Sequence, residues 1–382
     1  MLAAAALSEH PVPSAAVGEC IGELLDRSGQ LVEPRPPDLV ALFCTAPLIG
    51  ALDDIVAATT ELLHPAAMIG ASAVSVLGGS REAEHVGAVS MFALWGARCR
   101  PFRTVADAAT GRIAHDGLPD DVAGGATVVL LADPFTSPAD RVVADLEARH
   151  PGVRVAGGFA SAANAPGGNR LVLGDTVHRD GAVGVVVDAD VEPTTLVAQG
   201  CEPIGRPVAV TSVEGNVITS LAGEPALDHV RNLLEALPPE TRQRAASGLH
   251  LGVVIDEHRS EFRRGDFLMR GVLGADPDRR AVVVGDVVEL GATVQFQVRD
   301  AAAADDDLRD AFATVDRTVT GTLVFTCNGR GSRLFGHPDH DAALISEATD
   351  GAPLAGMFCA GEIGPVGGRS HLHGFTAVSV LF

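Results

Sequence analysis

The residues best suited to chemistry stand close together in the last thirty positions of the chain. This closing segment holds a thiol (Cys359), a carboxylate (Glu362), a guanidinium (Arg369) and two imidazoles (His371 and His373) between two apolar runs. The segment is also dense in glycine, which lets the backbone adopt conformations that fit a reacting group or a ligand. It is therefore the first place to expect a functional site.

Two kinds of chemistry are open to these side chains. A nucleophilic Cys359 would need His371 or His373 to lower its pKa, whereas the more common role of such a residue is a small buried apolar thiol, which we favour. The two histidines are two residues apart, so on an extended chain they share one face and could hold a metal or a haem iron. No third ligand stands at a suitable spacing, so we expect no metal site.

A second polar segment follows an apolar run that ends at Cys327. Asn328, Arg330 and Arg333 lie there in the sequence C-N-G-R-G-S-R. Two guanidinium groups offer forked donors that match a carboxylate, and the amide adds donors and an acceptor, so the segment suits the carboxylate of an amino acid. Alternatively, one of these arginines pairs with an acidic side chain of the protein itself.

The composition excludes several classes of function. The chain has 382 residues and a formal net charge of −21, and all 28 of its basic residues are arginine. Without lysine, the chain cannot by itself carry out Schiff-base chemistry, form a nucleotide-binding P-loop or act as a protein kinase. The negative charge argues against nucleic acid or an anionic membrane surface as a partner.

The cysteines and the N-terminus bear on the compartment. The six cysteines are scattered without a C-x-x-C pair, and no basic residue precedes the first acidic one, as a signal peptide would require. No apolar run reaches the length of a membrane span. We therefore expect a soluble protein of the cytoplasm.

Three segments of the chain share one plan of elements. Each has an apolar strand, a helical pattern, a strand that contains a glycine, and a further strand that opens at another glycine. The first strands are expected at 39–45, 127–132 and 322–327, the helices at 52–63, 139–149 and 340–349, and the central glycines are Gly70, Gly157 and Gly356. A helix of this length can cross over between two parallel strands, after which the last strand returns antiparallel. The sequence thus predicts mixed sheets built from β-α-β-β units, in which the central glycines mark a close backbone approach or a strand end.

The residues between the second and third units follow a different pattern. It predicts a hairpin at 208–221, an amphipathic helix at 226–237, strands near 251–255, 267–273, 281–284 and 293–298, and a helix at 305–313. We expect an α+β protein of two domains, residues 1–222 and 223–382.

Three stretches resemble FIST-domain proteins. They are C-E-P-I-G-R-P-V-A-V-T at 201–211, F-T-C-N-G-R-G-S-R-L-F-G at 325–336, and the closing segment. The resemblance covers essentially the whole chain, as a FIST N-terminal and a FIST C-terminal region, and it implies a stand-alone bacterial sensory module for small ligands such as amino acids. Family members that bind haem and respond to nitric oxide, or that recruit proteins in a ubiquitin ligase, supply two alternatives. No kinase, cyclase or methyl-accepting segment accompanies the FIST regions here, so we expect the signal to pass through a separate protein partner.

The expected function is binding of a small ligand, an amino acid or related carboxylate, in signal transduction. We expect no catalytic activity and no cofactor; a haem-binding gas sensor, a recruitment adaptor and a thiol enzyme are the alternatives. The ligand site is expected where the strand-end loops of the three units meet, at Ser72, Asn164, Asn328, Arg330, Arg333, Cys359, Glu362, Arg369, His371 and His373.

Overall fold

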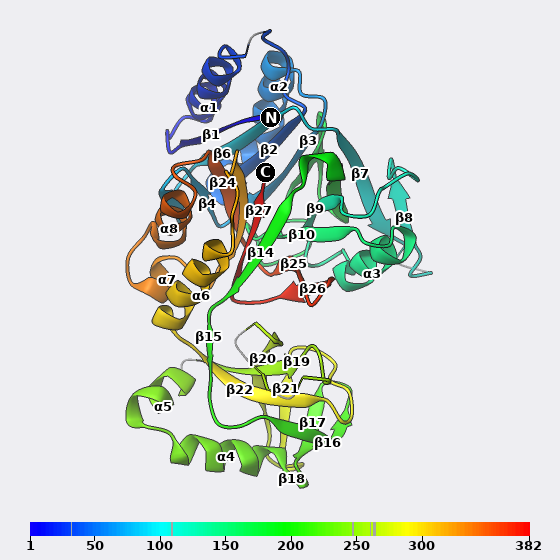
Figure 1. The fold of residues 1–382 in the computed structure, drawn as a ribbon, viewed down its shortest axis with the longest axis vertical. Helices are drawn as coiled ribbons and strands as arrows, with labels where there is room; N and C mark the ends of the chain where they lie inside the picture. Colours follow the sequence, from blue (N-terminus) through cyan, green and yellow to red (C-terminus); the bar gives the residue numbers. More distant parts are fainter. Residues whose placement is uncertain (32, 108–109, 247, 260, 263–264) are drawn as a thin grey trace.

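Three mixed β-sheets and a closed ring of strands make up the molecule, with the sheets in the upper part of Figure 1 and the ring in the lower part. The computed structural model describes residues 1–382 except 32, 108–109, 247, 260 and 263–264. Residues 1–200 and 300–382 form the three sheets with their helices, which we call the three-sheet body. Residues 201–299 form the ring and its two helices, which together we call the ring domain.

The first unit of the body contains the first predicted repeat. Its elements are β1 (Leu2–Ser8), α1 (Pro13–Ser28), β2 (Leu39–Thr45), the 3-10 helix η1 (Ala46–Ala51), α2 (Leu52–Leu63), β3 (Met68–Ala73), β4 (Ser75–Gly78), β5 (Arg81–Glu84) and β6 (Val89–Trp95). Strand β2 lies parallel to β3 and antiparallel to β6, and β1 pairs with the other edge of β6.

The second unit repeats this arrangement. Its elements are β7 (Cys99–Ala106), β8 (Ile113–Asp116), β9 (Thr127–Ala132), α3 (Ala139–Arg149), β10 (Arg154–Phe159), β11 (Leu171–Leu173), β12 (Thr176–His178) and β13 (Ala182–Val187). Strand β9 lies parallel to β10 and antiparallel to β13, with β7 beyond β13.

The third unit is split by the ring domain. After the short 3-10 helix η2 (Ala189–Val191), its elements are β14 (Thr194–Gln199), α6 (Ala301–Ala313), β23 (Thr322–Cys327), α7 (Ser332–Phe335), α8 (His340–Ala348), β24 (Leu354–Cys359), β25 (Glu362–Val366), β26 (Arg369–His373) and β27 (Thr376–Leu381). Strand β23 lies parallel to β24 and antiparallel to β27, with β14 beyond β27. The expected β-α-β-β unit is therefore present three times, and the α+β fold with mixed sheets is confirmed.

The ring domain is inserted between β14 and α6. Its elements are β15 (Cys201–Pro203), β16 (Val208–Glu214), β17 (Val217–Leu221), β18 (Glu224–Pro225), α4 (Ala226–Ala236), α5 (Pro239–Ala246), β19 (Leu249–Val254), β20 (Phe267–Asp276), β21 (Ala281–Val284) and β22 (Thr293–Arg299). The ring runs antiparallel from β22 through β16, β17, β21, β20 and β19 back to β22. Apolar side chains from these strands and α4 fill it.

The hairpin of each unit joins the sheet of another unit. Hairpin β4–β5 of the first unit pairs with β24 of the third, β11–β12 of the second pairs with β3 of the first, and β25–β26 of the third pairs with β10 of the second. The exchange is cyclic and ties the three units into one body. It also corrects one expectation, since most of the closing segment between its apolar runs is not a loop but the hairpin β25–β26.

The three central glycines lie inside their strands and allow this close pairing. A Cβ on any of them would lie within 2.3 Å of a carbonyl oxygen on the neighbouring first strand, so only glycine fits without a backbone shift. The pairs are Gly70 with Leu42, Gly157 with Leu130, and Gly356 with Val324. The prediction that these glycines mark a close approach of two backbones is confirmed.

The core of the body lies between the three sheets. Phe43 of β2 and Phe325 of β23 meet there edge to face, with their ring centroids 6.2 Å apart, and Leu131 of β9 belongs to the same cluster. Helices cover the outer faces, so the first strands are buried on both faces, which explains their uninterrupted apolar sequences.

One predicted helix boundary differs from the structure. Helix α6 begins at Ala301 rather than at 305, because Asp300 caps it by accepting a hydrogen bond from the Ala303 amide. The domain division expected after residue 222 falls between β17 and β18, inside the ring domain. Strand pairing instead separates the chain at Gly200 and Asp300, because the third unit resumes after the ring.

Candidate functional site

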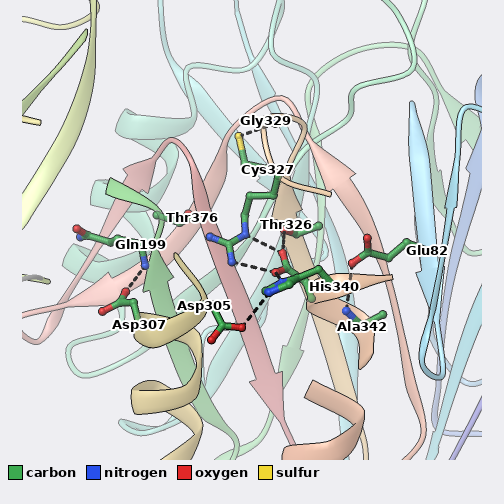
Figure 2. A network of polar contacts seen from close by, with 12 residues as sticks. Glu82, Gln199, Asp305, Asp307, Thr326, Cys327, Gly329, His340, Ala342 and Thr376 are labelled. Atoms are coloured by element: carbon green, nitrogen blue, oxygen red, sulfur yellow. Dashed lines mark hydrogen bonds and ion pairs between the residues drawn. The ribbon is translucent and has the colours of Figure 1, made fainter. Parts of the chain in front are cut away.

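Arg330 belongs to a buried polar network at the end of β23. Figure 2 shows this network, with its members Thr326 and His340 labelled. Its Nε donates to Asp341 Oδ2 at 2.7 Å and its Nη2 donates to Asp341 Oδ1 at 2.9 Å, while the Thr326 hydroxyl and His340 also bond to this carboxylate. Burial acts to raise the pKa of Asp341, but these partners outweigh it and hold the pKa well below its usual value. One forked face of Arg330 is therefore taken by an internal ion pair.

The remaining nitrogen of Arg330, Nη1, is buried and has no hydrogen-bond partner among the described residues. It points toward Gly200, where a Cβ would lie 3.1 Å from it. Asn328 precedes Arg330 on the same turn, and its Oδ1 is likewise buried without a partner, although its backbone N–H donates to the Cys359 carbonyl. A buried donor and a buried acceptor thus remain unused on this turn.

Glu362 lies across from these groups at the start of β25. Its Oε2 accepts from the Thr376 amide at 3.0 Å and from the Thr376 hydroxyl at 2.8 Å. Its Oε1 is buried and has no partner apart from the nearby Cys327 thiol. Burial raises the pKa of Glu362 to about 8, so this carboxyl is largely neutral at pH 7.

The ring domain contributes Arg299, at the end of β22. Its guanidinium carbon lies 3.5 Å above the ring centre of Phe375, a close cation–π contact, while Nε is buried without a partner. Burial lowers the pKa of Arg299, yet a guanidinium keeps its charge at any pH of interest. The His250 ring also contacts the Phe375 ring, edge to face, with the ring centroids 4.3 Å apart.

These groups lie within a small space between the body and the ring domain. A Cβ on Gly329 would lie 2.9 Å from the Phe375 ring and 3.4 Å from Arg299 Nη1, and both arginines act on the pKa of the nearby Cys201 thiol. We name the set of Arg299, Asn328, Arg330 and Glu362, with Cys327 and Phe375 beside them, the junction cluster. Its unused donors are two guanidinium nitrogens, Arg299 Nε and Arg330 Nη1. Its unused acceptors are the Asn328 amide oxygen and one carboxyl oxygen of Glu362.

Cys359 and Ser72 are buried near the strand ends, as expected, but Cys359 packs against the protein's own backbone and Ser72 is hydrogen-bonded within the fold. The Cys359 sulfur lies against Gly158, where a Cβ would be 2.4 Å away, and burial raises the pKa of this thiol well above its usual value. The Ser72 hydroxyl accepts from the Arg170 amide at 2.9 Å. The Ser161 hydroxyl accepts from the Val74 amide and donates to the Phe358 carbonyl, which joins the strand ends of all three units. The loops therefore meet as predicted, but they are hydrogen-bonded directly to one another.

Three of the expected residues are exposed. Asn164 lies on the surface, and the asparagine that is buried in that loop is Asn169, which donates to Asp133. Arg333 is exposed at the start of α7, at the margin of the junction cluster, where its charge lowers the pKa of Arg299. Arg369 lines a separate surface cavity of about 550 Å³ between α3 and the tip of hairpin β25–β26.

His371 and His373 share one face of β26, as their spacing predicted, with ring centroids 6.3 Å apart. Nε2 of His373 donates to the Gly364 carbonyl at 2.9 Å, and burial lowers its pKa to about 4, so the ring is neutral. Burial also lowers the pKa of His371. Among the residues that the structure describes, no group of three or more His, Cys, Asp or Glu side chains is arranged to hold a metal ion.

Comparison with protein families divides the chain into two matches. Residues 38–224 match the model of the FIST N domain, and residues 226–365 match that of the FIST C domain. The chain belongs to the FIST family. Arg299, Asn328, Arg330 and Glu362 all lie within the FIST C match, whereas Phe375 and Thr376 lie beyond its end.

Relatives of similar length occur in mycobacteria. The uncharacterized protein Rv0628c of Mycobacterium tuberculosis (strain ATCC 25618 / H37Rv) is 42% identical over 338 residues, which cover 86% of this chain and 87% of the relative. The uncharacterized protein Mb0898c of Mycobacterium bovis is 39% identical over 355 residues, with 91% of this chain and 90% of the relative covered. No helix in the described part of this FIST protein has the length and apolar character needed to span a membrane.

Sequence reasoning missed two members of the junction cluster. Arg299 is one of 28 arginines, and nothing in its surroundings, Q-V-R-D, marks it. Phe375 follows a glycine in the closing segment and adopts a left-handed backbone conformation with φ of 64°, which is rare for a large side chain. Only the insertion of the ring domain into the third FIST unit brings the two together.

Proposed function

We propose that this FIST protein is a sensory protein of the cytoplasm that binds an amino acid or related small carboxylate at the junction cluster. FIST domains are associated with sensing in signal transduction. In the proposal the protein carries out no catalytic step, requires no cofactor and passes its signal to a separate protein. Its charge of −21 disfavours nucleic acid and anionic membranes as that partner.

The observation that carries the proposal is the set of unused polar atoms in the junction cluster. Buried polar groups in folded proteins nearly always have partners, and leaving one without costs about 1–3 kcal/mol. Here Arg299 and Arg330 each keep a buried nitrogen free, while Asp341 neutralises only Arg330. A carboxylate placed between the two guanidinium groups would satisfy both nitrogens and supply the missing negative charge.

The other side of the cluster suits an ammonium group. Asn328 Oδ1 and Glu362 Oε1 are oxygens that can accept hydrogen bonds from a cation, and Glu362 can ionise when one approaches. The two sides together match the charged ends of an α-amino acid. Monocarboxylates would use only the arginine side and should bind more weakly.

The thiols near the cluster support a role without catalysis. Burial raises the pKa of Cys201 to about 12 and that of Cys327 also lies far above neutrality, so neither offers a thiolate at pH 7.

The test is a thermal-shift and calorimetric screen of free amino acids and small carboxylates. At least one amino acid should raise the melting temperature, and Arg299→Met should weaken its binding by about tenfold or more, the loss of one charge-assisted hydrogen bond. Arg231→Met is the matched control, because Arg231 is an exposed arginine of the same domain and pairs with Asp228 on its own helix. A panel without any shift, or equal binding by the Arg299 variant, would contradict the proposal.

A further inference from the structure

Two chain crossings connect the ring domain to the body, one at each end of the insertion. The first passes through Gly200 between β14 and β15, and the second passes through Asp300 between β22 and α6. The crossings lie side by side, because the Asp300 amide donates to the Gly200 carbonyl at 3.3 Å. Paired crossings at one place can act as a hinge, since few backbone torsions need to change for one part to swing against the other.

Hydrogen bonds and one small apolar cluster join the two parts across the junction. Gln199 Nε2 donates to the Phe267 carbonyl at 2.8 Å, and Arg270 Nη1 donates to the Leu372 carbonyl at 3.0 Å. Phe375 extends from the body into a small apolar cluster of the ring domain. By contrast, the core shared by the three sheets contains about thirty buried side chains, so the junction is much the weaker of the two interfaces.

The closed junction also keeps features that opening would relieve. Arg299 Nε, Arg330 Nη1, Asn328 Oδ1 and Glu362 Oε1 are shielded from water, although none has a well-formed hydrogen bond. Phe375 is held at a φ of 64°, a conformation that large side chains avoid. Separation of the ring domain would hydrate the four polar atoms and free the Phe375 side chain.

We propose that the ring domain and the body form a clamp that opens at the junction cluster, admits the ligand and closes on it. The ring domain supplies Arg299 and the body supplies Arg330, so a bound carboxylate joins the two parts and gives Arg299 the counter-ion that it lacks among the described residues. The position of the ring domain then reports whether the site is occupied. The identity of the occupant rests on the proposed function, whereas the opening motion does not depend on it.

Buried thiols provide a test on the ligand-free protein. Cys201 belongs to the ring domain's side of the junction and Cys327 to the body's side, while Cys20 and Cys44 lie deep in the first unit, away from it. Opening should make iodoacetamide label Cys201 and Cys327 about tenfold or more faster than the two reference thiols, because partial opening requires less free energy than global unfolding. Labelling of all four at one rate would overturn the clamp.

A disulfide across the junction sharpens the test. Ile255 of the ring domain and Gly367 at the tip of hairpin β25–β26 are close, since a Cβ on Gly367 would lie 3.2 Å from the Ile255 side chain. In the variant Ile255→Cys/Gly367→Cys, oxidation should slow labelling of Cys201 and Cys327 to the reference rate, and reduction should restore it. Each single variant should show no such redox dependence. If the disulfide forms, as shown by mass, and labelling stays fast, the proposed motion is wrong.

Amide hydrogen exchange of the wild-type protein gives a second measurement that needs no variant. Strands β20 and β26 at the junction should exchange faster than β2 and β23. Repeating the iodoacetamide labelling with L-alanine or L-glutamate separates the two proposals. Slower labelling of Cys201 and Cys327 supports both the clamp and the ligand class. If the junction opens but no amino acid of the panel slows the labelling, the clamp is supported and the ligand class is refuted. Uniform exchange in all four strands would overturn the clamp.

Discussion

The buried ion pair between Arg330 and Asp341 makes a prediction about stability that can be worked out from the contacts. Both side chains are fully buried, and two charge-assisted hydrogen bonds of 2.7 and 2.9 Å join them. The substitution Arg330→Met keeps most of the side-chain volume and removes the charge. It leaves the Asp341 carboxylate with the Thr326 hydroxyl and His340 but without its main counter-ion. Removing one partner of a buried pair typically costs about 3–5 kcal/mol, and we expect a loss in this range.

The assay is urea unfolding, followed by circular dichroism, of Arg330→Met and of the double variant Arg330→Met/Asp341→Leu. The double variant removes both charges, so it should recover most of the lost stability. Arg333→Met, an exposed neighbour, is the control and should change the free energy of unfolding by less than about 0.5 kcal/mol. A loss below about 1 kcal/mol for Arg330→Met, or a double variant no more stable than the single one, would refute the reasoning.

Two further substitutions test the fold and the site. Gly356→Ala places a Cβ 1.9 Å from the Val324 carbonyl oxygen and should cost about 3 kcal/mol or more in urea unfolding, whereas Gly18→Ala, on an open face of α1, should gain about 0.5–1 kcal/mol. Equal effects at the two glycines would show that the close pairing of β23 and β24 is wrong. Burial raises the pKa of Glu362 to about 8 in the folded protein, from its ordinary value of 4.5, so its contribution to stability is full below about pH 4.5 and is lost as the pH rises toward 8. Glu362→Gln, which keeps the acceptor for Thr376, should therefore flatten the fall in melting temperature between pH 5 and 8, and an unchanged pH profile would show that this carboxyl is not the one that titrates.

The stability result bears directly on how the ligand site is probed. Arg330 serves the fold through Asp341 and the site through Nη1, so loss of binding in an Arg330 variant would not separate the two roles. Arg299 has no ion pair among the described residues, and its contact with Phe375 lies at the junction alone. It is therefore the cleaner position for a binding test.

The sequence predicted well those elements whose burial is evident from the pattern of their own residues. The first strand of each unit is buried on both faces, which requires an unbroken apolar run, and the predicted bounds of all three agree with the structure. Helices α2 and α3 also agree, because each shows an apolar face and ends beside a polar or glycine-containing turn.

The features that were missed depend on partners far away in the chain. Hairpin β25–β26 mixes glycine, proline and polar residues with three apolar ones, Ile363, Val366 and Leu372, and it pairs with β10 of another unit, so its own sequence gives no clear strand pattern. The ring domain interrupts the third unit between β14 and α6, and a β-strand carries no sign of where its unit continues. For the same reason Arg299 could not be recognised, since its role arises from a contact with Phe375 across that insertion.

Comparison of equivalent positions in the three units separates the needs of the fold from those of the site. The register of the central glycines makes Thr45, Asp133 and Cys327 equivalent, each at the end of a first strand. In the first unit the Thr45 hydroxyl bonds to both the amide and the carbonyl of Ala88. In the second unit Asp133 accepts from the Phe135 amide, from the Thr136 hydroxyl and from Asn169.

In the described residues, the turn at the third strand end holds two buried side-chain atoms without partners, Asn328 Oδ1 and Arg330 Nη1, whereas the turn at the second holds one, Ser137 Oγ. The fold permits a fully paired side chain at the equivalent position, because both Thr45 and Asp133 are hydrogen-bonded there. The unused atoms around Cys327 are therefore not imposed by the β-α-β-β plan. They occur where the ring domain covers a strand end, which is the arrangement expected if the ring domain and the third unit together enclose a ligand that completes their hydrogen bonds.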